Sequence, residues 1–185
     1  ILLWFDLINA GESRVPMGSS LDFEGTPKFR VRAAGAFEQL PGCPDSVEDT
    51  LGAERLARIC AGECYNPSDR RRRITRIEVV RIGRQMNENE AVSELIEDPW
   101  LTIPCPEGEG VCEVEFEDPW FASAERELVY YVRAIQEPTQ AVNAGGLRCD
   151  GDECEPCYGD YRLPFDDDCL STTEERAWSS PIYLH

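Results

Sequence analysis

The sequence predicts an all-β fold, an immunoglobulin-like β-sandwich with long disulfide-stapled loops and one short inserted helix. Short runs of β-branched and aromatic residues recur along the 185 residues between turn signals rich in Gly, Pro and Asp. Only one segment shows helical periodicity, whereas a fold of alternating strands and helices would need several. Nine cysteines are far above average usage and favour covalent cross-links in the loops. At this length we expect a single domain over residues 1–185.

The first two strands are expected near the N-terminus. Residues 1–8 form an apolar run rich in strand-forming side chains, and residues 9–13 have the composition of a turn. Further along, Phe29, Val31 and Ala33 alternate with arginines. This period of two predicts a strand with one face in the core and the other in solvent.

A helical insertion is expected in residues 41–69, where the pattern changes. Ser46 and Asp49 have the spacing of a capping box, which marks the start of a helix. The apolar residues that can share one helix face are Leu51, Leu56, Ile59 and Cys60. We therefore expect one short helix that ends before Gly62.

The remaining strands follow the insertion. Residues 74–82 recover strand character, and residues 111–117 alternate three glutamates with apolar side chains that should face the core. Residues 128–135 are apolar on both faces and should form a central strand. Residues 177–184 contain Pro181, which cannot donate to a ladder and confines that strand to an edge or a strand start.

The cysteine spacing predicts one disulfide directly. Cys105 and Cys112 flank the turn-rich residues 106–110. If this loop closes as a hairpin, the two sulfurs come within bonding range. We therefore expect a Cys105–Cys112 bridge.

The other cysteines leave several pairings open. Four lie in the acidic segment at residues 144–170, namely Cys149, Cys154, Cys157 and Cys169. Two bridges there would supply order that burial cannot, and a structural zinc site is the alternative. Three more surround the expected helix, namely Cys43, Cys60 and Cys64. With an odd total, one thiol is unpaired or pairs outside the chain.

The charge excludes two classes of partner. The formal net charge is −18, from 36 acidic and 18 basic residues. Such a charge repels nucleic acids and anionic lipid surfaces. No apolar stretch approaches the roughly 20 residues that span a bilayer. We expect neither a nucleic-acid partner nor insertion into a membrane.

The acidic segment also offers candidate calcium ligands. Carboxylate oxygens are the ligands that calcium prefers. The candidates are Asp150, Asp152, Asp166 and Asp168. Their spacing does not match an EF-hand, so a solvated acidic loop without metal is the alternative, and no other cofactor is expected in this chain.

No catalytic residue is predicted. His185 is the only histidine and the final residue, so the sequence offers no Ser-His-Asp or Cys-His arrangement and no histidine-based metal centre. Carboxylates are abundant, but sequence alone does not single out an acid–base pair.

Two further motifs have structural interpretations. Glu-Asp-Pro-Trp occurs at residues 97–100 and again at residues 117–120. Asp-Pro starts a turn and the following Trp can anchor it in the core, with an aromatic platform for carbohydrate as the alternative. The four arginines at residues 70–73 are expected to pair with acids such as Asp69 and Glu78, with a polyanion or processing site as the alternative.

Several stretches resemble a known family. They are ILLWFDLINA (1–10), VPMGS (15–19), SDRRRRITRIEVVRI (68–82), LVYYVRAIQEPTQAVNAGGLRC (128–149), CYGDYR (157–162), DDDC (166–169) and EERAWSSPIY (174–183). Together they are similar to the C-terminal part of a large bacterial family, the domain of unknown function numbered 3604. Members of that family resemble the polymerase-and-histidinol-phosphatase (PHP) superfamily of metal-dependent hydrolases.

This resemblance implies a place in a larger protein. The metal ligands of such hydrolases lie in an N-terminal catalytic barrel, and none of their motifs occurs here. The chain would then be the accessory domain that follows the barrel, and the barrel would be its partner. The start at Ile1, without Met and inside an apolar run, likewise predicts a fragment or a processed product. Members of the family commonly look exported, which implies a periplasmic or extracellular location.

The sequence therefore predicts a non-catalytic accessory β-sandwich domain of a larger exported PHP-like hydrolase of unknown substrate. Loops at residues 41–69 and 144–170 would shape the substrate entrance of that hydrolase. A ligand- or carbohydrate-binding module and an extracellular structural subunit are the alternatives. The aromatic side chains that a binding module would use are Trp100, Trp120, Trp178, Tyr158 and Tyr161.

Overall fold

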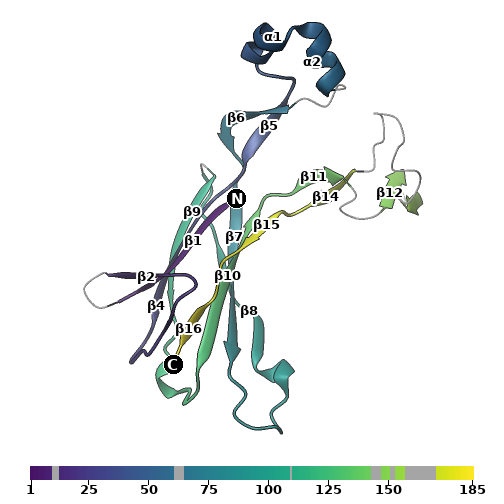
Figure 1. Ribbon diagram of the computed structural model, residues 1–185. Helices are drawn as coiled ribbons and strands as arrows, with labels where there is room; N and C mark the ends of the chain where they lie inside the picture. Colours follow the sequence, from purple (N-terminus) through teal and green to yellow (C-terminus); the bar gives the residue numbers. More distant parts are fainter. Residues whose placement is uncertain (10–12, 61–64, 109, 143–146, 151–152, 157–169) are drawn as a thin grey trace. The chain divides into compact units, whose positions relative to one another are not determined.

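The chain forms two compact units in the computed structural model (Figure 1). The structure describes residues 1–185 except 10–12, 61–64, 109, 143–146, 151–152 and 157–169. The first unit comprises Ile1–Ala36, Arg72–Glu137 and Glu175–His185. The second comprises Phe37–Arg71 and Pro138–Glu174, ranges that include both segments predicted as an insertion or long loop, 41–69 and 144–170. The assignment of residues 1–185 to one domain stays a prediction.

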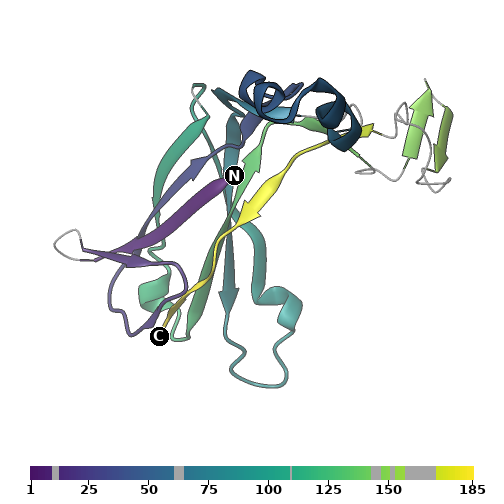
Figure 2. The same ribbon diagram turned by 45° about the horizontal axis from the view of Figure 1, so that its top comes forward.

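The first unit is built from two sheets, which Figure 2 shows from a second direction. The four-stranded sheet is antiparallel, with the order β2 (Arg14–Pro16), β1 (Leu2–Ile8), β4 (Lys28–Ala34) and β9 (Val111–Glu117). The six-stranded sheet has the order β3 (Ser20–Leu21), β16 (Ile182–Leu184), β10 (Leu128–Gln136), β7 (Ile74–Gly83) and β8 (Ile96–Pro104), and β15 (Arg176–Trp178) also pairs with β10. Only the β16–β3 pair is parallel among these strands. The predicted all-β, sandwich-like fold is confirmed.

The core of this unit lies between the two sheets. Phe29, Val31 and Ala33 are all fully buried, which confirms the alternation predicted for this strand. The ring of Phe29 stacks on Phe116 within its own sheet, with centroids 5.0 Å apart, and meets Tyr130 of the facing sheet at 4.7 Å. Aromatic packing of this kind joins the two layers beyond what buried area alone supplies.

The Cys105–Cys112 disulfide is confirmed, but its setting differs from the prediction. The Cα atoms are 5.6 Å apart. The expected hairpin is wrong, because β8 lies in the six-stranded sheet and β9 lies in the four-stranded sheet. The bridge therefore closes a connection between the two sheets, and both cysteines belong to the buried core.

Strand β10 is central, as predicted, and pairs with β7 along one edge. Along its other edge it pairs first with β16 and then with β15. Pro181 lies between these two short strands, so the proline interrupts the edge and β16 begins directly after it. Ser179 bridges the gap, because its amide donates to the carbonyl of Val132 and its hydroxyl accepts from the Val132 amide.

In the second unit, β5 (Phe37–Pro41) and β6 (Tyr65–Arg71) pair as antiparallel strands. The insertion at residues 41–69 was expected to contain a single helix and no strand, so β5 and β6 are an addition to the prediction. Arg71 lies over the ring of Phe37, 3.9 Å from its centroid. Arg70 pairs with Glu38 at 2.8 Å rather than with the expected Asp69. For Arg70, a partner on the neighbouring strand thus replaces the sequence neighbour that was expected.

Two short helices, α1 (Asp45–Leu51) and α2 (Ala53–Cys60), stand where one helix was expected. Gly52 separates them with φ 76°, a conformation that favours glycine. The predicted capping box is not formed, because α1 begins at Asp45 with Pro44 in the cap position and Ser46 lies inside the helix. Ile59 is 58% exposed, so the apolar face is only partly covered.

Two further strand pairs complete the second unit. β11 (Thr139–Val142) pairs with β14 (Leu170–Thr173), and β12 (Leu147–Asp150) pairs with β13 (Glu153–Pro156). Among the described helices, none has the length and apolar character needed to cross a membrane.

Candidate functional site

The two Glu-Asp-Pro-Trp motifs converge on one buried arginine, Arg81 of β7. The guanidinium carbon lies 4.3 Å from the ring centroid of Trp100 and 4.6 Å from that of Trp120. Its Nε donates to Glu97 at 2.5 Å, and its Nη1 donates to Asp118 at 2.8 Å. Each motif therefore contributes one carboxylate and one indole to the same cation.

Asp118 is the centre of this cluster. It is fully buried and accepts three hydrogen bonds, from Arg81, from the Tyr130 hydroxyl at 2.7 Å and from the Trp120 amide at 3.0 Å. Burial and the hydrogen bond to Asp118 raise the pKa of Tyr130 well above its ordinary value. Burial alone would lower the pKa of Arg81, but its hydrogen bonds to Glu97 and Asp118 outweigh burial and raise it.

This cluster links the two sheets, because Asp118 directly follows β9 whereas Arg81 and Tyr130 belong to β7 and β10. Trp100 packs against Phe116 and Tyr130, as expected for a core anchor. Trp120 is 45% exposed, so the prediction that both tryptophans anchor corners in the core is wrong for the second motif. The two identical Glu-Asp-Pro-Trp tetrapeptides thus have different structural roles.

A second polar cluster includes the single histidine. The Nε2 of His185 lies 2.6 Å from the Ser20 hydroxyl, and its Nδ1 lies 3.3 Å from Oε1 of Glu127. The same Oε1 accepts a hydrogen bond from Arg84 at 2.8 Å. Serine, histidine and carboxylate therefore lie in the order of a catalytic triad, an arrangement that the sequence analysis did not foresee because Ser20 and His185 are 165 residues apart.

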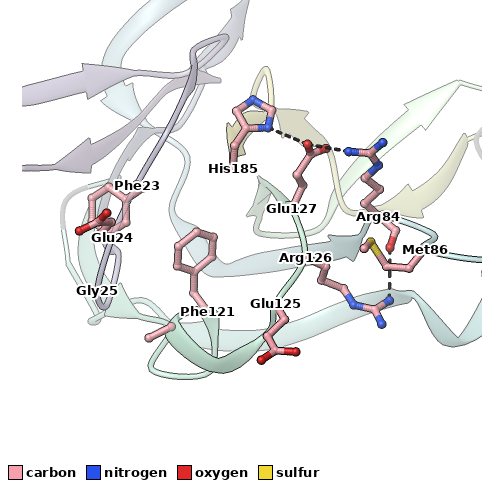
Figure 3. Close-up of a pocket in the computed structure, with 11 residues that line it drawn as sticks. Phe23, Glu24, Gly25, Arg84, Met86, Phe121, Glu125, Arg126, Glu127 and His185 are labelled. Atoms are coloured by element: carbon pink, nitrogen blue, oxygen red, sulfur yellow. Dashed lines mark hydrogen bonds and ion pairs between the residues drawn. The ribbon is translucent and has the colours of Figure 1, made fainter.

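A pocket of about 570 Å³ adjoins this cluster (Figure 3). Its walls are partly apolar, with Phe23 and Phe121 in edge-to-face contact at 5.9 Å. The described residues that line it include His185 and Glu127 but not Ser20, so the hydroxyl lies outside the cavity. Glu127 is also committed to Arg84, which reduces its ability to stabilise an imidazolium. The geometry is that of a hydrogen-bonded strand edge, and the expectation of no catalytic residue stays a prediction.

The outer face of the six-stranded sheet carries an unusual concentration of apolar side chains. One cross-strand row joins Tyr183, Val129, Ile82 and Ile96 in register. The next row pairs Tyr131 with Val80, which is fully buried, and the third starts at Trp178, opposite Arg133. We call the six residues Ile82, Ile96, Val129, Tyr131, Trp178 and Tyr183 the apolar outer face. Within the apolar outer face, Trp178 is 58% exposed, Ile96 is 43% exposed and Tyr183 is 41% exposed.

Ion pairs continue the row that starts at Trp178. Arg133 pairs with Glu78 at 2.9 Å and also with Asp98. Glu78 further accepts from Arg76 at 2.9 Å, so its partners are not the arginines at 70–73 that the sequence suggested.

The outer face of the four-stranded sheet is mixed, with Leu2, Trp4 and Val111 exposed toward one end and charged residues over the rest. Basic residues of β4 stand beside acidic residues of β9, and Lys28 pairs with Glu115 at 2.7 Å. The hydrogen bond from Lys28 lowers the pKa of Glu115. This is the polar surface that an antiparallel sheet normally presents to water. The row of four apolar residues in register, from Tyr183 to Ile96, makes the apolar outer face the candidate interaction site.

Comparisons with known proteins add no relative. No family model, no curated protein and no solved structure matches the chain.

The remaining predicted site residues lie mostly outside the described part of the chain. These are Cys64, Cys157, Cys169, Asp152, Asp166, Asp168, Tyr158 and Tyr161. Cys43 is disulfide-bonded, and the β12–β13 register sets Cys149 opposite Cys154. Within the described residues, no group of three or more His, Cys, Asp or Glu side chains is placed to hold a metal ion. Calcium at Asp150 and its neighbours, and the remaining cysteine pairings, Cys60 included, stay predictions.

Proposed function

We propose that the chain is a non-catalytic accessory β-sandwich domain of a larger, exported, PHP-like metal-dependent hydrolase. The apolar outer face carries this proposal. An antiparallel sheet in a sandwich buries one face and usually presents a polar face to water. Here the second face of the six-stranded sheet exposes Trp178, Ile96 and Tyr183 instead. The half-buried Val129 and Ile82 lie between Tyr183 and Ile96 in register, and apolar side chains gathered on one surface mark an interaction site.

The composition of this face suits a protein partner. Tyrosine and tryptophan are enriched at protein interfaces because each combines a large apolar ring with a polar group. Tyr131, Tyr183 and Trp178 supply such rings, and the paired Arg133 lies next to them in register. The partner proposed for this face is the N-terminal catalytic barrel that the family resemblance implies. Packing against the barrel would remove the exposed rings from water.

The disulfide supports export of the parent protein. Disulfides persist in oxidising compartments and are rare in the reducing cytosol. The Cys105–Cys112 bridge is buried and joins the connection between the two sheets. A periplasmic or extracellular location for the parent is part of the proposal.

The proposal is tested by isolating the natural protein that contains this sequence. We expect its mass to exceed the 20.9 kDa of this chain and its additional sequence to contain clustered His and Asp metal ligands. We also expect the purified 185-residue chain to hydrolyse no phosphomonoester in the presence of Mn²⁺ or Zn²⁺. Turnover that purifies with this chain, and that a chelator abolishes, would refute the accessory role.

A further inference from the structure

The outer face of the four-stranded sheet contains a hollow with an excess of positive charge. The hollow has a volume of about 470 Å³, within the range of roughly 300–1,000 Å³ usual for small-molecule pockets. Three arginines and two carboxylates line it, together with one indole: Trp4, Asp6, Arg14, Arg30, Arg32 and Glu113. A local positive excess is notable in a chain whose net charge is −18.

Most of these charges have partners. Arg30 is bound to Glu115, with 2.5 Å between Nη2 and Oε1, and lies 3.7 Å from Glu113. Arg14 reaches Asp6 only at 4.0 Å, the limit of an ion pair, and its side chain is 56% exposed. Arg14 can therefore turn toward a ligand at little cost.

Arg32 is the arginine of this hollow that is available to bind a ligand carboxylate. It is exposed, and among the described residues no carboxylate lies within ion-pair distance of its guanidinium. Its guanidinium carbon lies 5.1 Å from the ring centroid of Trp4. A guanidinium held beside an aromatic ring is pre-organised, so fewer rotamers are lost when it binds a carboxylate through two parallel hydrogen bonds.

Trp4 supplies an apolar surface next to this cation. It is 40% exposed, and its register partner on β4 is Arg32. On the other side, the pairing of β1 with β2 extends only to Asp6 opposite Pro16, so no paired strand flanks Trp4 there. The electron-rich face of an indole attracts groups with a positive edge, such as the C–H bonds on one face of a sugar ring.

We propose that this hollow binds a saccharide that ends in a uronic acid. Its carboxylate would pair with Arg32 and Arg14, and its sugar ring would lie against Trp4. One carboxylate per ligand is favoured, because the glutamates of β9 line the neighbouring surface and repel a second charge. Polyanions are disfavoured for the same reason and by the net charge of the chain.

The test uses the full 185-residue chain and two matched ligands. Cellobiouronic acid is titrated by calorimetry at low salt, with cellobiose as the neutral counterpart. We expect the acid to bind at least about tenfold more tightly than cellobiose, because charge-assisted hydrogen bonds are lost with the neutral sugar. Acetate, which has the carboxylate but no ring, is expected to compete at least about tenfold more weakly than the acid.

Single substitutions localise the site. Arg32→Gln and Trp4→Leu are each expected to weaken binding at least about tenfold. Trp178→Leu is the matched control, since it removes an exposed indole from the other sheet and should leave affinity unchanged. Circular dichroism checks that each variant is folded.

Four results would overturn the proposal: no binding of cellobiouronic acid, equal binding of cellobiose, equal competition by acetate, or unchanged affinity in folded Arg32→Gln. A loss of binding in Trp178→Leu equal to that in Trp4→Leu would place the ligand elsewhere and would also reject this site.

Discussion

Replacing the buried Asp118 by alanine is expected to lower the free energy of unfolding by about 3–5 kcal/mol. Asp118 is fully buried and accepts hydrogen bonds from Arg81, Tyr130 and the Trp120 amide. Without the carboxylate, the Arg81 guanidinium keeps only Glu97 as a charged partner while its side chain is 10% exposed. An uncompensated charge in such a place is costly, because water cannot replace the lost partner.

This loss is large compared with the total free energy of unfolding of a domain. Domains are usually stable by about 5–15 kcal/mol, so the variant should lose about a fifth or more of its stability. Urea unfolding followed by tryptophan fluorescence gives the free energy of unfolding. The control is Glu117→Ala, which removes an exposed carboxylate from the adjacent residue and should change stability by no more than about 0.5 kcal/mol. A cost for Asp118→Ala below about 1 kcal/mol, or equal to that of Glu117→Ala, would refute the central role of this cluster.

The same cluster makes stability depend on alkaline pH. The pKa of Tyr130 is raised in the folded chain, so its hydroxyl stays protonated where an unfolded tyrosine ionises, near pH 10. Because the unfolded state then binds fewer protons, stability is fully present below about pH 10 and falls above it, by about 1.4 kcal/mol per pH unit for one group. Tyr130→Phe should show a shallower decline above pH 10, and an identical decline would contradict the assignment.

Two further predictions concern the disulfide of the sandwich and a close backbone contact within it. Replacing Cys105 and Cys112 together by alanine should lower the free energy of unfolding by about 2.5 kcal/mol, the loop-entropy value for residues seven apart in sequence. An unchanged urea midpoint under oxidising conditions would contradict it. Gly35→Ala should lower stability by about 3 kcal/mol or more, since a Cβ there would lie 1.8 Å from the carbonyl oxygen of Arg72. A melting temperature equal to that of the wild type would show that the two chain segments can separate freely.

The strands were predictable because their signal is local. In β4 and β9 the inward positions are apolar and most outward positions are charged, so a period of two identifies both the strand and its buried face. The Cys105–Cys112 bridge was predictable from its spacing. Its role between two sheets was not, since spacing does not reveal which sheet each strand joins.

The candidate sites depend on contacts between distant segments. Glu97 and Asp118 meet at Arg81 only after the two sheets pack, and identical tetrapeptides gave no hint that they use different carboxylates. The sequence did contain a signal for the apolar outer face. Val129 and Tyr131 are apolar at outward positions of β10, which indicated a strand covered on both sides. Sequence alone did not say that one of those sides is uncovered in this chain.

The most direct test of the accessory role is hydroxyl-radical labelling of the isolated chain and of the natural parent protein. Trp178 and Tyr183 lie on the apolar outer face, whereas Trp4 lies on the other sheet and is 40% exposed. We predict that all three are labelled in the isolated chain, and that Trp178 and Tyr183 become protected in the parent while Trp4 stays labelled. Equal labelling of Trp178 and Tyr183 in both samples, or a natural protein no longer than this chain, would contradict the account.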